Sequence, residues 1–310
     1  MSSFPRLPWL AAALTLLTLG ACSKSNDATA APPAAAKTYT LNLTPALVVG
    51  QKFSVVTDLS DTELTKITIT VPGMPAPQDQ NQNTSLVAHI EADGEVLAIY
   101  PNGSAQKIAL TLKAITATNN QTALPNLPAA GAKVVVEKTA GSITVTVDGQ
   151  PAPAGIGKIL RDVFESGDEK YTNQAMFGPK APVAIGDSWP VDSASLLSSF
   201  KQAIGDVSAI KGTMKLDGLT GTGDGQVAEV SGTVNIDGFK PPLPAGVNMT
   251  IDSSSGLMHM AGSIPSIAKG TDKGSTSMTI KLEAHGEQQG LQLKISTSGE
   301  QKKTSTITFP

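Results

Sequence analysis

The amino-acid sequence predicts a mainly β protein of the α+β type: a large bent antiparallel sheet or half-barrel, with two short helices in the middle of the chain. Three observations lead to this prediction. Apolar residues alternate with threonine, lysine or glutamine in many short runs, which is typical of antiparallel strands with one wet face. Glycine-containing turn pairs recur between such runs. Helical spacing of apolar residues is clear in two segments, both near the centre of the sequence.

The strand pattern begins after residue 37 and continues almost to the end of the chain. Hydrophobic residues make up 40% of the 310 residues, enough to bury a core. The alternation is clearest in runs 67–71, 108–113, 143–147, 278–282 and 291–295.

Turn signals separate these runs, and the strongest predicts a hairpin at Asp93-Gly94. Asp148-Gly149 and Asp237-Gly238 are followed by prolines, so we expect the chain to leave the sheet there. The other predicted turns are Asn102-Gly103, Asp217-Gly218, Asp224-Gly225 and Ser255-Gly256.

Two helices are predicted, at 155–166 and 193–204, because each segment places its apolar residues on one helical face. Asp192 or Ser193 would cap the second helix, and Gly205 would end it. Trp189 lies between the two helices in an irregular stretch, and we interpret it as a buried anchor.

The body, residues 38–310, therefore divides into a strand-rich half (38–150), a helical middle (151–205) and a second strand-rich half (206–310). Nearly continuous hairpin signals favour one long bent sheet with the helices covering its apolar concave face. Two separate sheets remain the alternative.

The amino-terminal 22 residues predict export and a lipid anchor. Arg6 precedes an apolar run at 7–19, which is too short to span a bilayer and is typical of a signal peptide at residues 1–21. The sequence Leu19-Gly20-Ala21-Cys22 resembles the lipobox of bacterial lipoproteins. That resemblance implies that Leu19, Gly20 and Ala21 are recognised by the signal peptidase, and that Cys22 is acylated.

The same resemblance predicts the location of the mature chain. Ser23 follows the cysteine in place of an aspartate, which by the sorting habit of enteric bacteria favours the outer membrane. Residues 22–37 are rich in alanine, proline and serine, and we interpret them as a flexible tether. The expected partner is therefore the membrane, through acyl chains on Cys22.

Composition argues against several other classes. Lysine and arginine together number 23 against 26 acidic residues, a net charge of −3 that leaves no footprint for nucleic acid. The single cysteine excludes both a disulfide framework and a thiolate metal cage.

Residue patterns give no catalytic, cofactor or metal site that we would predict. His89, His259 and His285 are widely separated and lack metal-ligand spacing. The acidic group formed by Asp58, Asp61 and Glu63 lacks the pattern of a calcium loop, and we interpret it as a turn between strands.

One weak enzymatic pattern stays open as an alternative. Ser198 and Lys201 match S-x-x-K on a predicted helix, without the companion motifs of penicillin-recognising enzymes. A hydrolase would need these two side chains within hydrogen-bond reach in an accessible pocket.

The leading functional prediction is a non-enzymatic, lipid-anchored envelope protein that holds a hydrophobic ligand inside the bent sheet. The order of elements is similar to that of the LolA/LolB type of half-barrel, and this resemblance implies acyl-chain binding. Two short segments, LVVGQKFSV and IGDSW, are similar to segments of uncharacterised bacterial lipoproteins. An envelope scaffold that pairs through an exposed strand edge is the alternative. The ligand lining could come from seven apolar residues, for which filling a core is the simpler interpretation: Met249, Ile251, Met258, Met260, Met278, Ile280 and Leu282.

Overall fold

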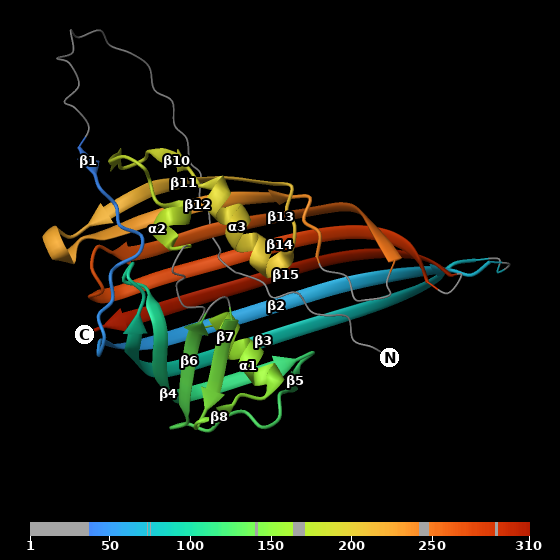
Figure 1. Ribbon diagram of the computed structural model, residues 1–310, viewed down its shortest axis with the longest axis horizontal. Coiled ribbons are helices and arrows are strands. Elements are labelled where there is room, and N and C mark those ends of the chain that lie inside the picture. The colour runs from blue at the N-terminus through green and yellow to red at the C-terminus, as the bar shows by residue number, and fades with distance from the viewer. Residues whose placement is uncertain are drawn as a thin grey trace, which may run out of the picture.

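A computed structural model describes residues 37–310, apart from 73, 75, 140–141, 164–170, 242–247 and 289–290. One antiparallel sheet of 13 strands dominates this part of the chain, and it does not close into a barrel (Figure 1). The predicted mainly β fold with a large antiparallel sheet is therefore confirmed.

The strands fall into a long and a short group. Six long strands run across the molecule in Figure 1: β2 (Lys52–Thr70), β3 (Gln78–Ile99), β4 (Ala105–Asn119), β13 (Asn248–Pro265), β14 (Gly270–Gln288) and β15 (Leu291–Phe309). The shorter strands of the sheet are β5 (Thr122–Ala123), β6 (Lys133–Thr139), β7 (Ser142–Val147), β8 (Gln150–Pro151), β10 (Ser188–Pro190), β11 (Ala209–Thr220) and β12 (Val227–Asp237).

Strand order shows how the two strand-rich halves meet. The sequence along the sheet is β10-β11-β12-β13-β14-β15-β2-β3-β4-β6-β7-β8, with β5 beside β4. The last strand, β15, thus pairs with β2, over a register that runs from Gln292↔Thr70 to Thr308↔Ser54. A separate two-stranded sheet pairs β1 (Thr38–Tyr39) with β9 (Val183–Ala184). The two halves of the body therefore share one continuous sheet.

Register also shows that one face of the sheet carries both hydrophobic clusters. Directly paired residues of antiparallel strands point to the same face. Met258 pairs with Met278, Met278 with Gln301, Gln301 with Asp61, and Asp61 with Leu86. We call the face that these five residues share the inner face.

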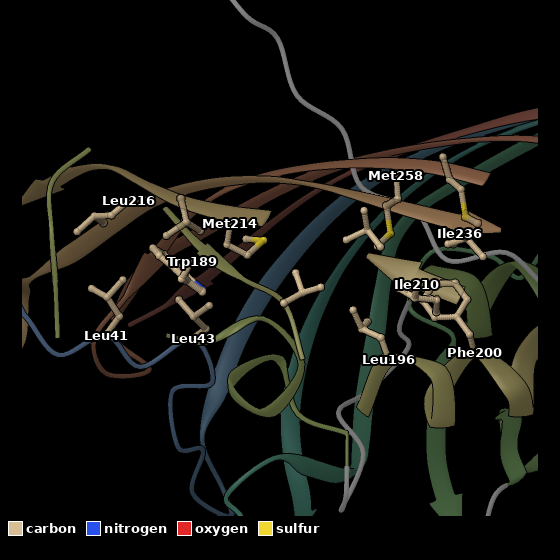
Figure 2. Close-up of a cluster of buried hydrophobic side chains, with 14 of the residues drawn as sticks. Leu41, Leu43, Trp189, Leu196, Phe200, Ile210, Met214, Leu216, Ile236 and Met258 are labelled. Atoms are coloured by element: carbon tan, nitrogen blue, oxygen red, sulfur yellow. The ribbon is translucent and has the colours of Figure 1, made fainter. Parts of the chain in front are cut away.

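Helices α2 (Asn173–Phe177) and α3 (Ser193–Ile204) cover one end of the inner face. Figure 2 shows Leu196 and Phe200 of α3 beside Ile210 of β11. We call this core the α3 cluster, and its buried residues are Leu41, Leu43, Val183, Trp189, Val191, Leu196, Phe200, Ile210, Met214, Leu216, Ala228, Val230, Val234, Ile236, Phe239, Met258, Met278 and Ile280.

Helix α1 (Ala154–Val163) covers the other end. We call this core the α1 cluster, and its buried residues are Val55, Leu59, Ala88, Ile90, Ala92, Ala105, Ile108, Leu110, Leu112, Ala117, Ala132, Val134, Val136, Val145, Ile156, Ile159 and Leu160. Both predicted helices are therefore present, and each packs its apolar face on the sheet.

The ends of α3 agree with the sequence prediction. Asp192 caps the helix by accepting a hydrogen bond from the backbone N–H of Ser195, and Gly205 follows the last residue. Trp189 is buried, and its indole N–H donates to the carbonyl of Phe177 at 2.7 Å, so it is the predicted anchor. The five-residue helix α2 was not predicted, because it is too short to show a helical period.

Several predicted turns are wrong. Asp93-Gly94 lies inside β3, where the ring of Phe53 packs over the glycine, and Ser255-Gly256 lies inside β13. Asp217-Gly218 forms a bulge within β11. In each case the long-range ladder continues through a local turn signal, because neighbouring strands satisfy the backbone groups.

The remaining turn pairs behave differently. Asn102-Gly103 and Asp224-Gly225 do lie in turns between strands, and the chain leaves the sheet at Asp237-Gly238 as predicted. Asp148-Gly149 was expected to leave the sheet but reverses the chain into β8, with both residues at positive φ. No helix in the described part of the chain combines the length and the hydrophobicity that crossing a membrane requires.

Candidate functional site

Between the two clusters, polar side chains interrupt the inner face. On β15, Ile295 and Ile307 are apolar, whereas the inner-face positions between them carry polar side chains or, at Gly299, no side chain. We call these residues the central strip: Thr57, Asp61 and Glu63 of β2, Asp272 and Thr276 of β14, and Gln301, Lys303 and Ser305 of β15. It is the candidate functional site, because Thr57 and Gln301 are buried, and burying a polar group costs free energy unless the group is hydrogen-bonded.

Part of the central strip is structural. Thr57 is fully buried, and its hydroxyl lies 2.6 Å from the hydroxyl of Ser305, directly across on β15. This pair satisfies both hydroxyl groups and ties β2 to β15 inside the sheet.

Asp272 is an acidic residue of the central strip whose pKa is shifted from its ordinary value. It pairs with Ile307, and Ile307 with Val55, so its side chain shares the inner face with apolar neighbours. Burial raises the pKa of the Asp272 carboxyl to about 6. The group can therefore change its charge near neutral pH.

Gln301 lies at the other end of the strip and is 3% exposed. Neither its amide nitrogen nor its amide oxygen has a hydrogen-bond partner among the described residues. The side chain borders a small hollow, open to solvent on one side, that has room for about one water molecule. We call this the Gln301 hollow; it is lined by Asp61, Thr62, Glu63, Met278, Ile280, Gly299, Glu300 and Gln301.

The interpretation of Asp58, Asp61 and Glu63 as a turn is wrong. All three lie within β2, so they alternate between the faces of the sheet. Asp58 pairs with His89 on the outer face, whereas Asp61 and Glu63 face inward and border the hollow. The tertiary structure thus separates one acid from the other two.

The histidines lie apart from one another. His89 bonds to Asp58 at 2.7 Å and to Glu91 at 3.2 Å, and these hydrogen bonds raise the pKa of its imidazole. His285 lies 2.6 Å from Asp252, and His259 lies 3.3 Å from the hydroxyl of Thr233. The described part of the chain brings no three His, Cys, Asp or Glu side chains into a metal-binding group.

Ser198 and Lys201 do not meet the geometric condition for a hydrolase. Both side chains are exposed on α3. Lys201 instead forms an ion pair with Asp206 at 2.8 Å, and this hydrogen bond raises the pKa of the lysine. A lysine held in its charged form cannot act as the general base for the serine.

The seven apolar residues suggested as a ligand lining do share the inner face, on β13 and β14. Met258, Met278 and Ile280 are buried in the α3 cluster, and Met260 and Leu282 pack against it. Core filling, the simpler interpretation, therefore accounts for these five. Met249 and Ile251 lie nearer the end of β13 and stay partly exposed.

Cys22 and the recognition residues Leu19, Gly20 and Ala21 lie outside the described residues.

The two residues of the central strip that sequence reasoning missed are Gln301 and Asp272. For Gln301 the signal was a break in the alternation along β15, where apolar inner-face residues at both ends, such as Leu293, Ile295 and Ile307, enclose Gln301, Lys303 and Ser305.

Comparison with known proteins identifies no family. No protein-family model and no curated protein matches the chain. Among solved structures, lipovitellin, described for its lipid–protein interactions, matches with a TM-score of 0.31 and 11% identity, over 87% of this chain and 25% of its own. The chain thus spans about a quarter of the lipovitellin chain.

Two further solved structures match with lower TM-scores. A Pseudomonas aeruginosa FadL homologue has a TM-score of 0.16 and 9% identity, over 84% of this chain and 90% of its own. The P. putida toluene transporter TodX has a TM-score of 0.14 and 11% identity, over the same shares. At these TM-scores none of the three likenesses carries an argument about function.

Proposed function

We propose that the protein is a lipid-anchored, non-enzymatic envelope protein that binds a hydrophobic ligand on the inner face of its sheet. The lipobox-like sequence at Leu19–Cys22 supports the anchor. The observation that carries the binding proposal is a patch of apolar inner-face residues that belongs to neither cluster. We call it the distal patch: Ile67 and Ile69 of β2, Met249 and Ile251 of β13, and Leu293 and Ile295 of β15.

The distal patch is continuous across the sheet. Ile251 pairs with Ala284, Ala284 with Ile295, and Ile295 with Ile67. Five of its six side chains are partly exposed, and Ile295 is 9% exposed. An apolar ligand that covers this patch gains about 25 cal/mol for each Å² of apolar surface removed from water.

The anchor is tested by replacing the proposed acylated residue. Cys22→Ser should abolish acylation, because serine has no thiol to form the thioether. The variant should move from the detergent phase to the aqueous phase in a Triton X-114 partition, and its intact mass should lack the acyl chains. Unchanged partitioning and mass would remove the lipid anchor from the proposal.

The ligand is tested by native mass spectrometry of the full chain purified from membranes. We expect co-purifying lipid with the wild-type protein and a clear loss with Ile67→Asn, which places an amide in the distal patch. Leu64→Asn is the matched control, because Leu64 lies on the same strand, is 50% exposed and faces outward. Equal lipid retention by both variants would contradict binding at the distal patch.

The edges of the sheet give less support to a scaffold that pairs through an exposed strand. The edge strands β10 and β8 contain three and two residues. Short edge strands offer few free backbone groups for pairing with another chain.

A further inference from the structure

Turns at one end of the sheet carry exposed apolar side chains. At this end β13 and β15 finish and β2 and β14 begin, and we call it the tether end. Val48 and Val49, in the segment that enters β2, are each 61% exposed. Ile267, between β13 and β14, and Ile185, directly after β9, are exposed as well. We call these four residues the apolar tips.

The turn that enters β2 holds its two valines in a defined conformation. Val48 accepts a hydrogen bond from the backbone N–H of Gln51, and its own N–H donates to the side-chain oxygen of Gln51 at 3.1 Å. Gly50 occupies the third position of the turn at positive φ, as a type II turn requires. Val49 therefore occupies the second position.

The same glutamine joins this turn to the turn between β13 and β14. The side-chain nitrogen of Gln51 donates to the carbonyl of Ala268 at 2.6 Å. Ile267 directly precedes Ala268. The two valines and Ile267 therefore lie on neighbouring turns.

The turn that contains Ile185 has the same pattern of hydrogen bonds. Asp187 donates its backbone N–H to the carbonyl of Ala184, and its carboxylate accepts the N–H of Ala184 at 2.7 Å. Gly186 has a positive φ, so Ile185 occupies the second position. Both turns thus carry a branched apolar side chain at a position that usually holds proline or a polar residue.

The path from the proposed anchor enters the body at this end. Thr38 of β1 pairs with Ala184 of β9, next to Ile185. Figure 1 shows β1 at the end of the sheet where the C-terminus lies. Cys22 precedes Lys37 by fifteen residues, which span at most about 50 Å.

This reach favours one orientation of the sheet. Strand β2 contains 19 residues and is therefore about 60 Å long. If the sheet stood on its opposite end, where β2 leads to β3, Lys37 would lie near the limit of the reach of the tether. The anchor therefore brings the tether end, with its apolar tips, to the membrane.

Lysines beside the apolar tips suit a phospholipid surface. Lys37 directly precedes β1, and Lys269 follows Ile267 by two residues; both are exposed. Such ammonium groups can contact lipid phosphates while the neighbouring apolar side chains enter the head-group region.

From these observations we propose that the tether end is a membrane-docking surface, whose apolar tips enter the head-group region of the bilayer that holds the acyl chains of Cys22. The inference rests on the lipid anchor of the proposed function and adds an orientation to it. The sheet stands on the membrane, and the distal patch lies at the opposite end, away from the bilayer.

The first experiment places a fluorescent label at each tip. Cys22 is the single cysteine of the chain, so its acylation leaves an introduced cysteine as the one free thiol. Val49→Cys, Ile185→Cys and Ile267→Cys are labelled with nitrobenzoxadiazole, and the acylated full chain is reconstituted into equimolar phosphatidylethanolamine and phosphatidylglycerol vesicles. The emission of each label should shift to shorter wavelength, and lipids with a nitroxide on the acyl chain should quench it.

Met74→Cys is the matched control for these labels. Met74 is 54% exposed and lies between β2 and β3, at the opposite end of the sheet. Its label should keep the emission of a probe in water and escape quenching. Equal quenching at Met74 and at the apolar tips, or stronger quenching at Met74, would overturn the inference.

Failure of the anchor has a different signature from failure of the docking. Labelling of the wild-type chain would show that the thiol of Cys22 is free, which contradicts the anchor. The same labels are then placed in a Cys22→Ser background and mixed with the vesicles. Quenching at the tips without quenching at Met74 would still support docking, and quenching at neither would overturn it.

The second experiment puts a charge at one tip and measures the label at another. Val49→Asp in the labelled Ile267→Cys chain should reduce quenching, because a carboxylate resists leaving water and Gln51 joins the two turns. Met74→Asp in the same labelled chain should leave quenching unchanged. Unchanged quenching with Val49→Asp would overturn joint docking of the tips. Thermal unfolding of both variants at the wild-type midpoint verifies that the fold is intact.

A second copy of the chain is the other occupant that the experiments distinguish. If the apolar tips pair between two copies, oxidation of unlabelled Val49→Cys should give disulfide-linked dimers, and the labelled chain should show no lipid quenching. That result would assign the tips to self-association and overturn the inference.

Discussion

Single charged residues show how local hydrogen bonds determine the charge states of the chain. Asp192 accepts the backbone N–H of Ser195 and lies 3.0 Å from the ammonium of Lys180. These interactions hold the pKa of the Asp192 carboxyl at about 2. The ionised carboxylate therefore stabilises α3 fully at pH values above about 4, where the Asp192 side chain is ionised in the unfolded chain as well.

We predict that Asp192→Ala lowers the free energy of unfolding by about 1 kcal/mol at pH 7, because α3 loses its N-cap. The folded pKa lies below the unfolded value of 3.8, so this contribution is present above about pH 4 and disappears as the pH falls towards 2. Urea unfolding at pH 7 and pH 3 measures it. Asp192→Asn is the control, because asparagine also caps helices; an equal loss in that variant would assign the effect to the Lys180 pair.

Asp272 should have the opposite pH dependence. Burial raises its folded pKa to about 6, so its ionisation opposes folding. The protein should be most stable with respect to this group below about pH 4, and should lose up to about 3 kcal/mol as the pH rises through 6. Asp272→Asn should remove that loss, and urea unfolding at pH 4.5 and pH 8 measures it. An unchanged pH dependence in the variant would contradict the burial of this carboxyl.

At the scale of the element, close packing on the sheet depends on small residues. A Cβ atom on Gly212 of β11 would lie 2.7 Å from the carbonyl oxygen of Thr233 and 3.1 Å from a methyl group of Val191. Val191 also donates its backbone N–H to the carbonyl of Gly212 at 3.1 Å. The glycine therefore lets the segment before α3 approach the sheet.

We predict that Gly212→Ala lowers the free energy of unfolding by about 1–3 kcal/mol, as overpacking in a core does. Gly274→Ala is the control on β14, because an added Cβ atom would meet nothing within 4 Å there. It should be neutral or slightly stabilising. Thermal unfolding of the two variants makes the comparison, and equal midpoints would show that Gly212 is not under steric constraint.

At the scale of the whole molecule, two hydrophobic clusters share one sheet without sharing residues. Leu160 of α1 and Leu196 of α3 are almost fully buried, one in each cluster. The pairing of β15 with β2 joins the strands beneath them through the central strip.

We predict that Leu160→Ala and Leu196→Ala each lower the free energy of unfolding by about 2–5 kcal/mol. Their effects should add within about 0.5 kcal/mol, because the two sites have no common neighbours. Urea unfolding of the two single variants and the double variant tests this. Two separate transitions would mean that each cluster unfolds on its own despite the shared sheet.

The central strip shows which features of the candidate site the sequence could predict and which it could not. Alternation identified strand runs on both sides of it, and apolar spacing located α1 and α3. The residues of the candidate site come from β2, β14 and β15, which lie more than 200 positions apart in the chain at their extremes. Asp61 and Gln301 meet only because the last strand pairs with the first long one.

The sequence by itself determined the β-rich class, the two packed helices and the alternation that divides polar from apolar faces. Each of these follows from interactions between residues close in the chain. Only the tertiary structure decided that Asp93-Gly94 continues a strand, that Asp61 and Glu63 face inward, and that the amide of Gln301 is buried beside them. The physical reason is that strand register is determined by hydrogen bonds and packing between distant segments, and shifting it by one residue would turn every side chain to the other face.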